Sequence, residues 1–208
     1  MSDLLVHYHD AHCVIVEKPA DLLSVPGRTP GPNLADQVRA AFADARVVHR
    51  LDEATSGLML FARGEAMAGA FGRLFEGRQI NKRYEAVVHG LVETADGTLD
   101  WPLIRDWPNR PRQKVCFETG RASQTHYIRL SLPPERNATR LALIPITGRT
   151  HQLRVHLLQF GHPILGDRLY GNDAVQEAAP RLLLHACELG FVHPVSGEAI
   201  RVSSPAPF

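Results

Sequence analysis

The chain has only three cysteines, Cys13, Cys116 and Cys187, and they lie far apart in the sequence. The short paired spacings that are typical of zinc sites and redox pairs do not occur among them. We therefore expect all three thiols to be reduced and structural.

Long apolar runs are also missing from the 208 residues. No stretch approaches the roughly 20 apolar residues that a membrane-spanning helix needs. The segment Met1–Leu5 has neither a basic flank nor a cleavable apolar core. Since 44% of the residues are apolar, as in ordinary globular proteins, the sequence predicts one cytoplasmic domain without a membrane segment.

The net charge is also small, at +1, but the charged residues are unevenly distributed along the sequence. Between Trp101 and Tyr170 there are eleven Lys and Arg against four Asp and Glu, a surplus of seven. A basic stretch set against an acidic remainder is typical of a protein that presents one face to phosphates. Charge alone does not distinguish this interpretation from an arginine-rich surface with no ligand.

The most informative segment is His49–Gly57, with the sequence HRLDEATSG, which separates the apolar residues Val47-Val48 from Leu58–Phe61. An unpaired carboxylate near a core costs several kcal/mol, so Asp52 needs an explanation. One is an Asx-turn that joins two strands, which the turn residues by themselves favour. The other is a reactive carboxylate.

This segment resembles the signature of the RluA-type family of RNA pseudouridine synthases. Five other segments resemble the family in the family's order: Lys82–Ala86, Pro145–His156, Gly161–Asp167, Leu184–Ala186 and His193-Pro194. The resemblance covers almost the whole chain. It implies an α+β fold, with a bent, mostly antiparallel mixed sheet, flanking helices and a central active-site cleft. It also implies a single catalytic domain over residues 1–208, without an S4-type RNA-binding domain.

The resemblance also assigns roles to four residues. It makes Asp52 the catalytic residue and Arg154 the cation that keeps it ionised. Tyr84 matches the tyrosine that stacks on the target base, although a packed core tyrosine is the commoner fate at the start of a strand. Arg50 would fill the RNA stack after the uridine has left it. The reaction needs neither a metal nor another cofactor.

Periodicity and turn residues predict the main elements. We expect strands at Cys13–Lys18 and Tyr84–Val88, a helix from the N-cap Asn33 to about Ala45, a helix at Glu65–Phe75 stopped by Gly77, a hairpin of Thr125–Leu132 with Thr139–Pro145 around Pro133–Asn137, a helix at His151–Gln159, and a closing hairpin of Leu189–His193 with Glu198–Val202.

Residues 97–121 lack periodicity and combine tryptophan, proline and arginine. Exposed tryptophan beside arginine offers stacking faces together with phosphate donors, as in a nucleic-acid contact. The alternative is an inserted hairpin whose tryptophans cover the core, and the sequence does not favour either. If the loop contacts RNA, the side chains involved are Arg105, Trp107, Arg110, Arg112 and Lys114. Arg149 joins them from the segment before the last long helix.

Histidines do not form a convincing metal site. His7, His9 and His12 are close in sequence, but we interpret them as part of a surface turn. His151 and His156 are five residues apart, which does not place them on one helical face. We expect no metal.

One subgroup fits best. Val25–Arg28, Asp106–Pro111, Gln113–Cys116 and Glu118–Gly120 resemble members that modify a 23S rRNA hairpin and the anticodon stem-loop of certain tRNAs. RNA is therefore the expected partner, and we expect a monomer. Two rival functions are a glycoside or nucleoside hydrolase, which would need a second carboxylate facing Asp52, and a non-catalytic RNA-binding module.

Overall fold

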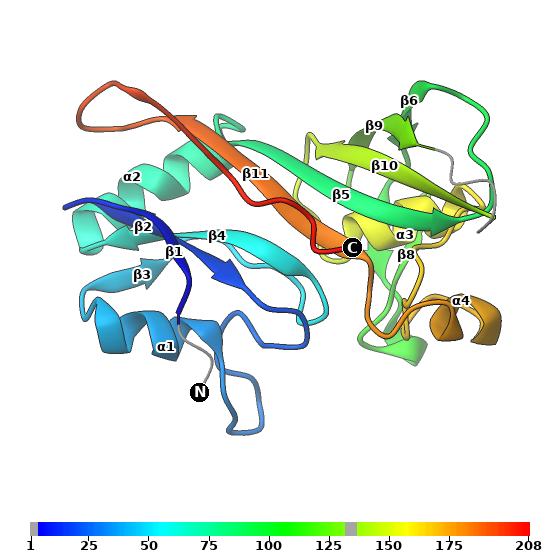
Figure 1. The fold of residues 1–208 in the computed structure, drawn as a ribbon, viewed down its shortest axis with the longest axis horizontal. Helices are drawn as coiled ribbons and strands as arrows, with labels where there is room; N and C mark the ends of the chain where they lie inside the picture. Colours follow the sequence, from blue (N-terminus) through cyan, green and yellow to red (C-terminus); the bar gives the residue numbers. More distant parts are fainter. Residues whose placement is uncertain (1–3, 132–136) are drawn as a thin grey trace. The chain divides into compact units, whose positions relative to one another are not determined.

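The computed structural model describes residues 4–131 and 137–208 (Figure 1). They cluster into two compact units. The first contains the residues up to Lys82 together with Ala186–Pro207, and the second contains Arg83–His185 with Phe208. Within the described residues, none of the helices has both the length and the apolar character that crossing a membrane requires.

The first unit combines one sheet with two helices. Its elements are β1 (Val6–His9), β2 (Cys13–Lys18), α1 (Leu34–Ala41), β3 (Ala45–Val47), β4 (Ser56–Arg63), α2 (Glu65–Glu76), most of β11 (Leu184–Val192) and β12 (Ala199–Ser203). The strands follow the order β1-β2-β4-β11, with β12 paired to β11 and β3 to β4. The pairs β1/β2, β2/β4, β3/β4 and β11/β12 are antiparallel.

Both faces of this sheet are buried, which explains the apolar runs of β2 and β4. Cys13 and Ile15 point to the side that packs on Phe71 of α2. Val14 and Val16 point to the other side and pack on residues of α1. Since neighbouring side chains on a strand face opposite ways, a strand covered by helices on both sides must be apolar throughout. Figure 1 shows α1 and α2 on opposite sides of these strands.

The second unit has a four-stranded antiparallel sheet and a separate hairpin. Its elements are β5 (Asn81–His89), β6 (Asp96–Asp100), β7 (Leu103–Arg105), the 3-10 turn η1 (Trp107–Asn109), β8 (Gln113–Val115), β9 (Gln124–Ser131), β10 (Ala138–Pro145), α3 (Gln152–Gln159) and α4 (Asp173–Glu177). The sheet order is β5-β10-β9-β6, and β7 pairs only with β8.

Side-chain hydrogen bonds connect helix α3 to β9. His156 lies with its Nδ1 3.0 Å from the Thr125 hydroxyl, and the Gln152 amide donates to the same hydroxyl at 3.0 Å. The ring of Phe160, the residue after the helix, contacts the ring of Tyr127, with centroids 5.1 Å apart. A buried polar helix face is stable here because its donors and acceptors find partners on the sheet.

Most predicted elements are confirmed, and the fold is α+β. Helix α2 ends at the predicted Gly77, and Asn33 caps α1 by accepting a hydrogen bond from the Asp36 amide at 3.0 Å. None of the three cysteines, all of which lie in the described part of the chain, forms a disulfide bond. Part of the predicted turn Pro133–Asn137, residues 133–136, lies outside the described residues, as does Leu132.

Three predictions about local structure are corrected. Helix α1 ends at Ala41 rather than near Ala45, because residues 45–47 pair with β4 as β3. His7 and His9 lie in β1 rather than in a turn. The strand predicted from Tyr84 begins earlier, since β5 starts at Asn81.

Candidate active site

Asp52 lies in the turn between β3 and β4, where the sequence places it. The Thr55 N–H donates to the Asp52 carbonyl at 3.1 Å, so a backbone hydrogen bond closes the turn. The Asp52 side chain is half-buried, while its neighbours Arg50 and Glu53 are exposed. The turn therefore presents Asp52 at the edge of the packed first unit.

Two buried polar side chains hold the turn on both sides of Asp52. Lys18 is fully buried at the end of β2, and its Nζ donates to the Glu53 carbonyl at 2.7 Å. Ser24 Oγ donates to the Leu51 carbonyl at 2.7 Å and accepts from the Leu51 N–H at 3.1 Å. The same Lys18 ammonium also donates, at 2.7 Å each, to the carbonyls of Pro19 and Leu22.

Sequence reasoning missed both Lys18 and Ser24. A weak signal existed for Lys18, because a lysine that ends an otherwise apolar strand next to a proline is unusual. For Ser24 no local signal distinguishes it from other loop serines. Their importance follows from contacts with residues 27 to 35 positions away in the chain.

His49 fixes the start of the same turn. Its Nε2 accepts the Leu60 N–H at 2.8 Å, and its ring stacks on Phe75 with centroids 4.5 Å apart. Burial, with a smaller contribution from the charge of Lys82, lowers the pKa of His49 to about 3. The ring is therefore neutral near pH 7, with its proton on Nδ1. The uncharged, stacked ring therefore holds His49, which directly precedes Arg50, in one orientation.

The other two candidate catalytic residues belong to the second unit. Tyr84 lies in β5, opposite Leu143 of β10, and is half-buried. Arg154 lies in α3 and is 6% exposed. Because Asp52 belongs to the first unit, its contact with either residue stays a prediction.

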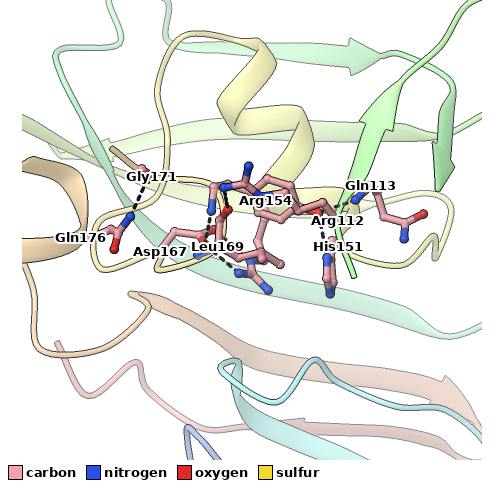
Figure 2. A network of polar contacts seen from close by, with 9 residues as sticks. Arg112, Gln113, His151, Arg154, Asp167, Leu169, Gly171 and Gln176 are labelled. Carbon is pink, nitrogen blue, oxygen red and sulfur yellow. Dashed lines mark hydrogen bonds and ion pairs between the residues drawn. The ribbon is translucent and has the colours of Figure 1, made fainter. Parts of the chain in front are cut away.

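Arg154 forms a buried ion pair with Asp167 (Figure 2). Its Nε donates to Asp167 Oδ2 at 2.8 Å and its Nη2 to Oδ1 at 2.7 Å. The sequence did not identify Asp167 as a partner of Arg154. The bidentate pair uses two of the five N–H donors of a guanidinium, so it does not exclude a second acceptor.

The segment around Trp107 forms the β7–β8 hairpin. Trp107 itself is 59% exposed, and the guanidinium carbons of Arg105 and Arg110 lie 5.0 and 5.2 Å from its ring centroid. The hairpin alternative is thus right for the backbone, but this tryptophan does not cover the core. Trp101 is half-buried and meets the ring of His156 edge-on.

The remaining predicted RNA-binding side chains are at the surface. Arg112 and Lys114 lie in or next to β8 and are exposed, and Lys114 Nζ is 3.6 Å from Asp106 Oδ1. Arg149 is also exposed and donates from Nε to the Ala122 carbonyl at 3.2 Å. Phe117, which sequence reasoning missed, follows β8 and is 74% exposed. A lone aromatic residue in a polar turn was its signal.

One group of potential metal ligands comes together among the described residues: Asp10, Cys13 and His193. Asp10 already accepts the Cys13 N–H at 2.8 Å and the Tyr8 hydroxyl at 2.8 Å. His193 Nδ1 accepts the Ser196 N–H at 3.1 Å, so its proton is on Nε2, which lies 3.2 Å from Asp10 Oδ2. Burial raises the pKa of Cys13 to about 12. Deprotonation of this thiol would have to accompany the binding of a metal ion.

Known proteins resemble this chain over almost its whole length. The sequence profile described as "RNA pseudouridylate synthase" matches residues 12–159. The "Dual-specificity RNA pseudouridine synthase RluA" of Escherichia coli K12 is 46% identical over 99% of this chain and 94% of its own length. Its namesake from Yersinia pestis is 45% identical over 99% and 100%. Among solved structures, "Human RNA Pseudouridylate Synthase Domain Containing 1" is similar with a TM-score of 0.86 and 31% identity, covering 99% of this chain and 84% of that one.

Replacing Lys18 with methionine tests the hold on the Asp52 turn. The substitution keeps most of the side-chain volume but leaves buried carbonyls without their donor. We expect the free energy of unfolding to fall by about 2–4 kcal/mol in urea titrations. Lys114→Met is the matched control at an exposed site and should change stability by less than about 0.5 kcal/mol. Equal stabilities of the two variants would contradict the assignment.

Replacing Arg154 with alanine tests the buried ion pair. The change leaves the Asp167 carboxylate, which is 1% exposed, without its cation. We expect a loss of about 3–5 kcal/mol at pH 7. Arg168→Ala, at the exposed neighbour of Asp167, serves as the control. If the broken ion pair causes this loss of stability, replacing both partners, in the double variant Arg154→Met with Asp167→Leu, restores part of it. A loss equal to the sum of the losses in the two single variants would contradict this explanation.

Proposed function

The chain belongs to the RNA pseudouridylate synthase family, and on this premise we propose that it isomerises specific uridines to pseudouridine in a 23S rRNA hairpin and in tRNA anticodon stem-loops. The observation that best supports a catalytic Asp52 is the hold on its turn by Lys18 and Ser24. A turn needed only to connect two strands has no use for a fully buried ammonium. The relatives that carry the dual-specificity name support the choice of RNA.

Pseudouridine formation breaks the N-glycosidic bond, turns the base and rejoins it through carbon. Atoms are conserved and no electron carrier is needed, so no cofactor is part of the proposal. Asp52 is the catalytic carboxylate, acting on the base or on the ribose. Positioning of such a group supplies a large share of rate enhancement, which is what a rigid turn provides. Arg154 would keep Asp52 ionised.

Tyr84 and Arg50 act on the base and on the space it leaves. The Tyr84 ring would stack on the extruded uracil, and its phenol would assist the movement of a proton once the base has turned. Arg50 is exposed beside Asp52 and would enter the RNA stack. Flipping a base out costs a few kcal/mol, which stacking and phosphate contacts must offset.

The β7–β8 hairpin offers those contacts. Two arginines already lie against Trp107 and help to hold its ring as a stacking platform, while the charges of these arginines remain at the surface. Arg112, Lys114 and Arg149 would add phosphate contacts. Phe117 is a second exposed ring on the same segment and joins the proposed RNA-binding surface.

Sequencing-based mapping of pseudouridine in total RNA, with and without this protein, tests the function directly. We expect sites that depend on the protein in 23S rRNA and in tRNA. Free uracil as the product would instead indicate a hydrolase, and unchanged RNA a binding module. We further propose that the protein acts as a cytoplasmic monomer. Light scattering of the RNA-bound complex measures its molar mass and so checks the monomeric state.

Removing the Asp52 carboxylate should abolish the reaction. We expect Asp52→Asn and Asp52→Ala to form no pseudouridine and to bind the RNA stem-loop as tightly as the wild type, since phosphate contacts dominate affinity. Tritium release from labelled uridine measures the first property, and filter binding the second. Glu53→Gln, at the exposed neighbour, should remain active. Measurable turnover by Asp52→Asn would contradict the assignment of Asp52 as the catalytic carboxylate.

Hairpin variants test the RNA-binding surface. Changing Arg105 and Arg110 together to alanine should weaken binding and make its salt dependence shallower by roughly one unit of slope per lost contact. The rate at saturating RNA should survive. Trp107→Ala should cost about 1–3 kcal/mol of binding through lost stacking.

The control for these variants is Arg39→Ala, at an exposed arginine of α1. Unchanged affinity of the hairpin variants, together with a large drop in melting temperature, would make the hairpin a structural element and move the search for RNA contacts to Arg149.

A further inference from the structure

The Tyr170 side chain joins the β7–β8 hairpin to the helix that carries Arg154. Its hydroxyl accepts the backbone N–H of Gln113, in β8, at 2.8 Å. The same hydroxyl lies 2.8 Å from Nδ1 of His151, the residue before α3. Tyr170 is 8% exposed, so these contacts are made away from bulk water.

The ring of Tyr170 makes a second set of contacts. The guanidinium carbon of Arg154 lies 5.0 Å from the ring centroid, and that of Arg112 lies 5.8 Å from it. Each distance is within the range of a cation–π interaction. One ring thus meets both a proposed RNA-binding arginine and the proposed partner of the catalytic carboxylate.

Asp167 fixes both ends of this arrangement. Its Oδ1 accepts the backbone N–H groups of Leu169 and Tyr170 at 2.9 and 3.0 Å while also binding Arg154 Nη2. The Arg112 guanidinium donates to the Leu169 carbonyl. Figure 2 shows Arg154, Asp167, Leu169 and Arg112 gathered at this point. The guanidinium of Arg154 is therefore held at its edge by a carboxylate and at its face by a ring.

We propose that Tyr170 is a positioning residue that ties the backbone of the β7–β8 hairpin to Arg154, so that RNA which orders the hairpin also orders the arginine. The proposal rests on the proposed function, in which Arg154 supports Asp52. A displacement of a catalytic group by about 1 Å costs on the order of 100-fold in rate, so a small change in this support is measurable. The tie runs through the Gln113 N–H, which side-chain substitutions in the hairpin leave in place.

Tyr170→Phe is the decisive variant, because it removes the hydroxyl and keeps the ring. We expect the single-turnover rate at saturating RNA to fall about 10-fold, while the Kd for the RNA stem-loop changes by less than about 2-fold. The exposed cationic side chains that meet phosphates are unchanged in this variant. A purely structural role predicts the opposite, with the loss confined to melting temperature or to Kd.

Tyr127→Phe is the matched control. Tyr127 is also a buried tyrosine of the second unit, and its hydroxyl is 2.7 Å from Thr94 Oγ1, outside the Tyr170 contacts. We expect a comparable drop in melting temperature and an unchanged rate. If Tyr170→Phe does not fold, His151→Phe removes the other partner of the hydroxyl, 2.8 Å away, which helps to fix where that oxygen meets the Gln113 N–H, and this variant is judged by the same criterion.

Two outcomes overturn the proposal: a rate for Tyr170→Phe equal to that of Tyr127→Phe, or a loss that lies wholly in Kd. Failure of the proposed function looks different, because wild type and Tyr127→Phe would then also form no pseudouridine. A selective loss of rate in Tyr170→Phe, with pseudouridine formed by the wild type, supports the positioning role.

Discussion

The buried ammonium of Lys18 is the interaction on which the first unit's candidate site depends. Removing a charge from water is costly unless hydrogen bonds replace the lost hydration, and three carbonyl oxygens at 2.7 Å do so here. Those carbonyls must then point inward, which determines the path of the loop after β2 and of the turn after Asp52. Ser24 adds the matching contact before Asp52. One buried ammonium thus helps to fix both the loop after β2 and the turn that carries Asp52.

The second unit holds its charged group in another way. Arg154 is paired with a carboxylate from a turn rather than with backbone carbonyls, and an aromatic ring lies against its face. Buried ion pairs are rarely the most stable solution for a core, so their presence is better explained by a need for one fixed guanidinium orientation.

The β7–β8 hairpin shows the reverse arrangement, with apolar surface presented to solvent. The Trp107 ring is contacted by two arginines and remains exposed although its burial would be favourable, and Phe117 is more exposed still. Exposed aromatic residues beside cations suit a ligand that has both flat bases and phosphates. The hairpin is also linked through Gln113 and Tyr170 to Arg154, so the proposed RNA-binding surface and the proposed partner of Asp52 share one set of contacts.

The sequence by itself determined the elements whose signals are local: the apolar strands β2 and β4, helix α2 with its stop at Gly77, the capped start of α1, and the motif that places Asp52 between two strands. Only the tertiary structure decided the early end of α1, the β7–β8 pairing and the partners of the buried charges. The reason is physical. Periodicity and capping act over a few residues, whereas the carbonyls around Lys18 and the carboxylate beside Arg154 are chosen by the packing of segments up to 35 residues apart.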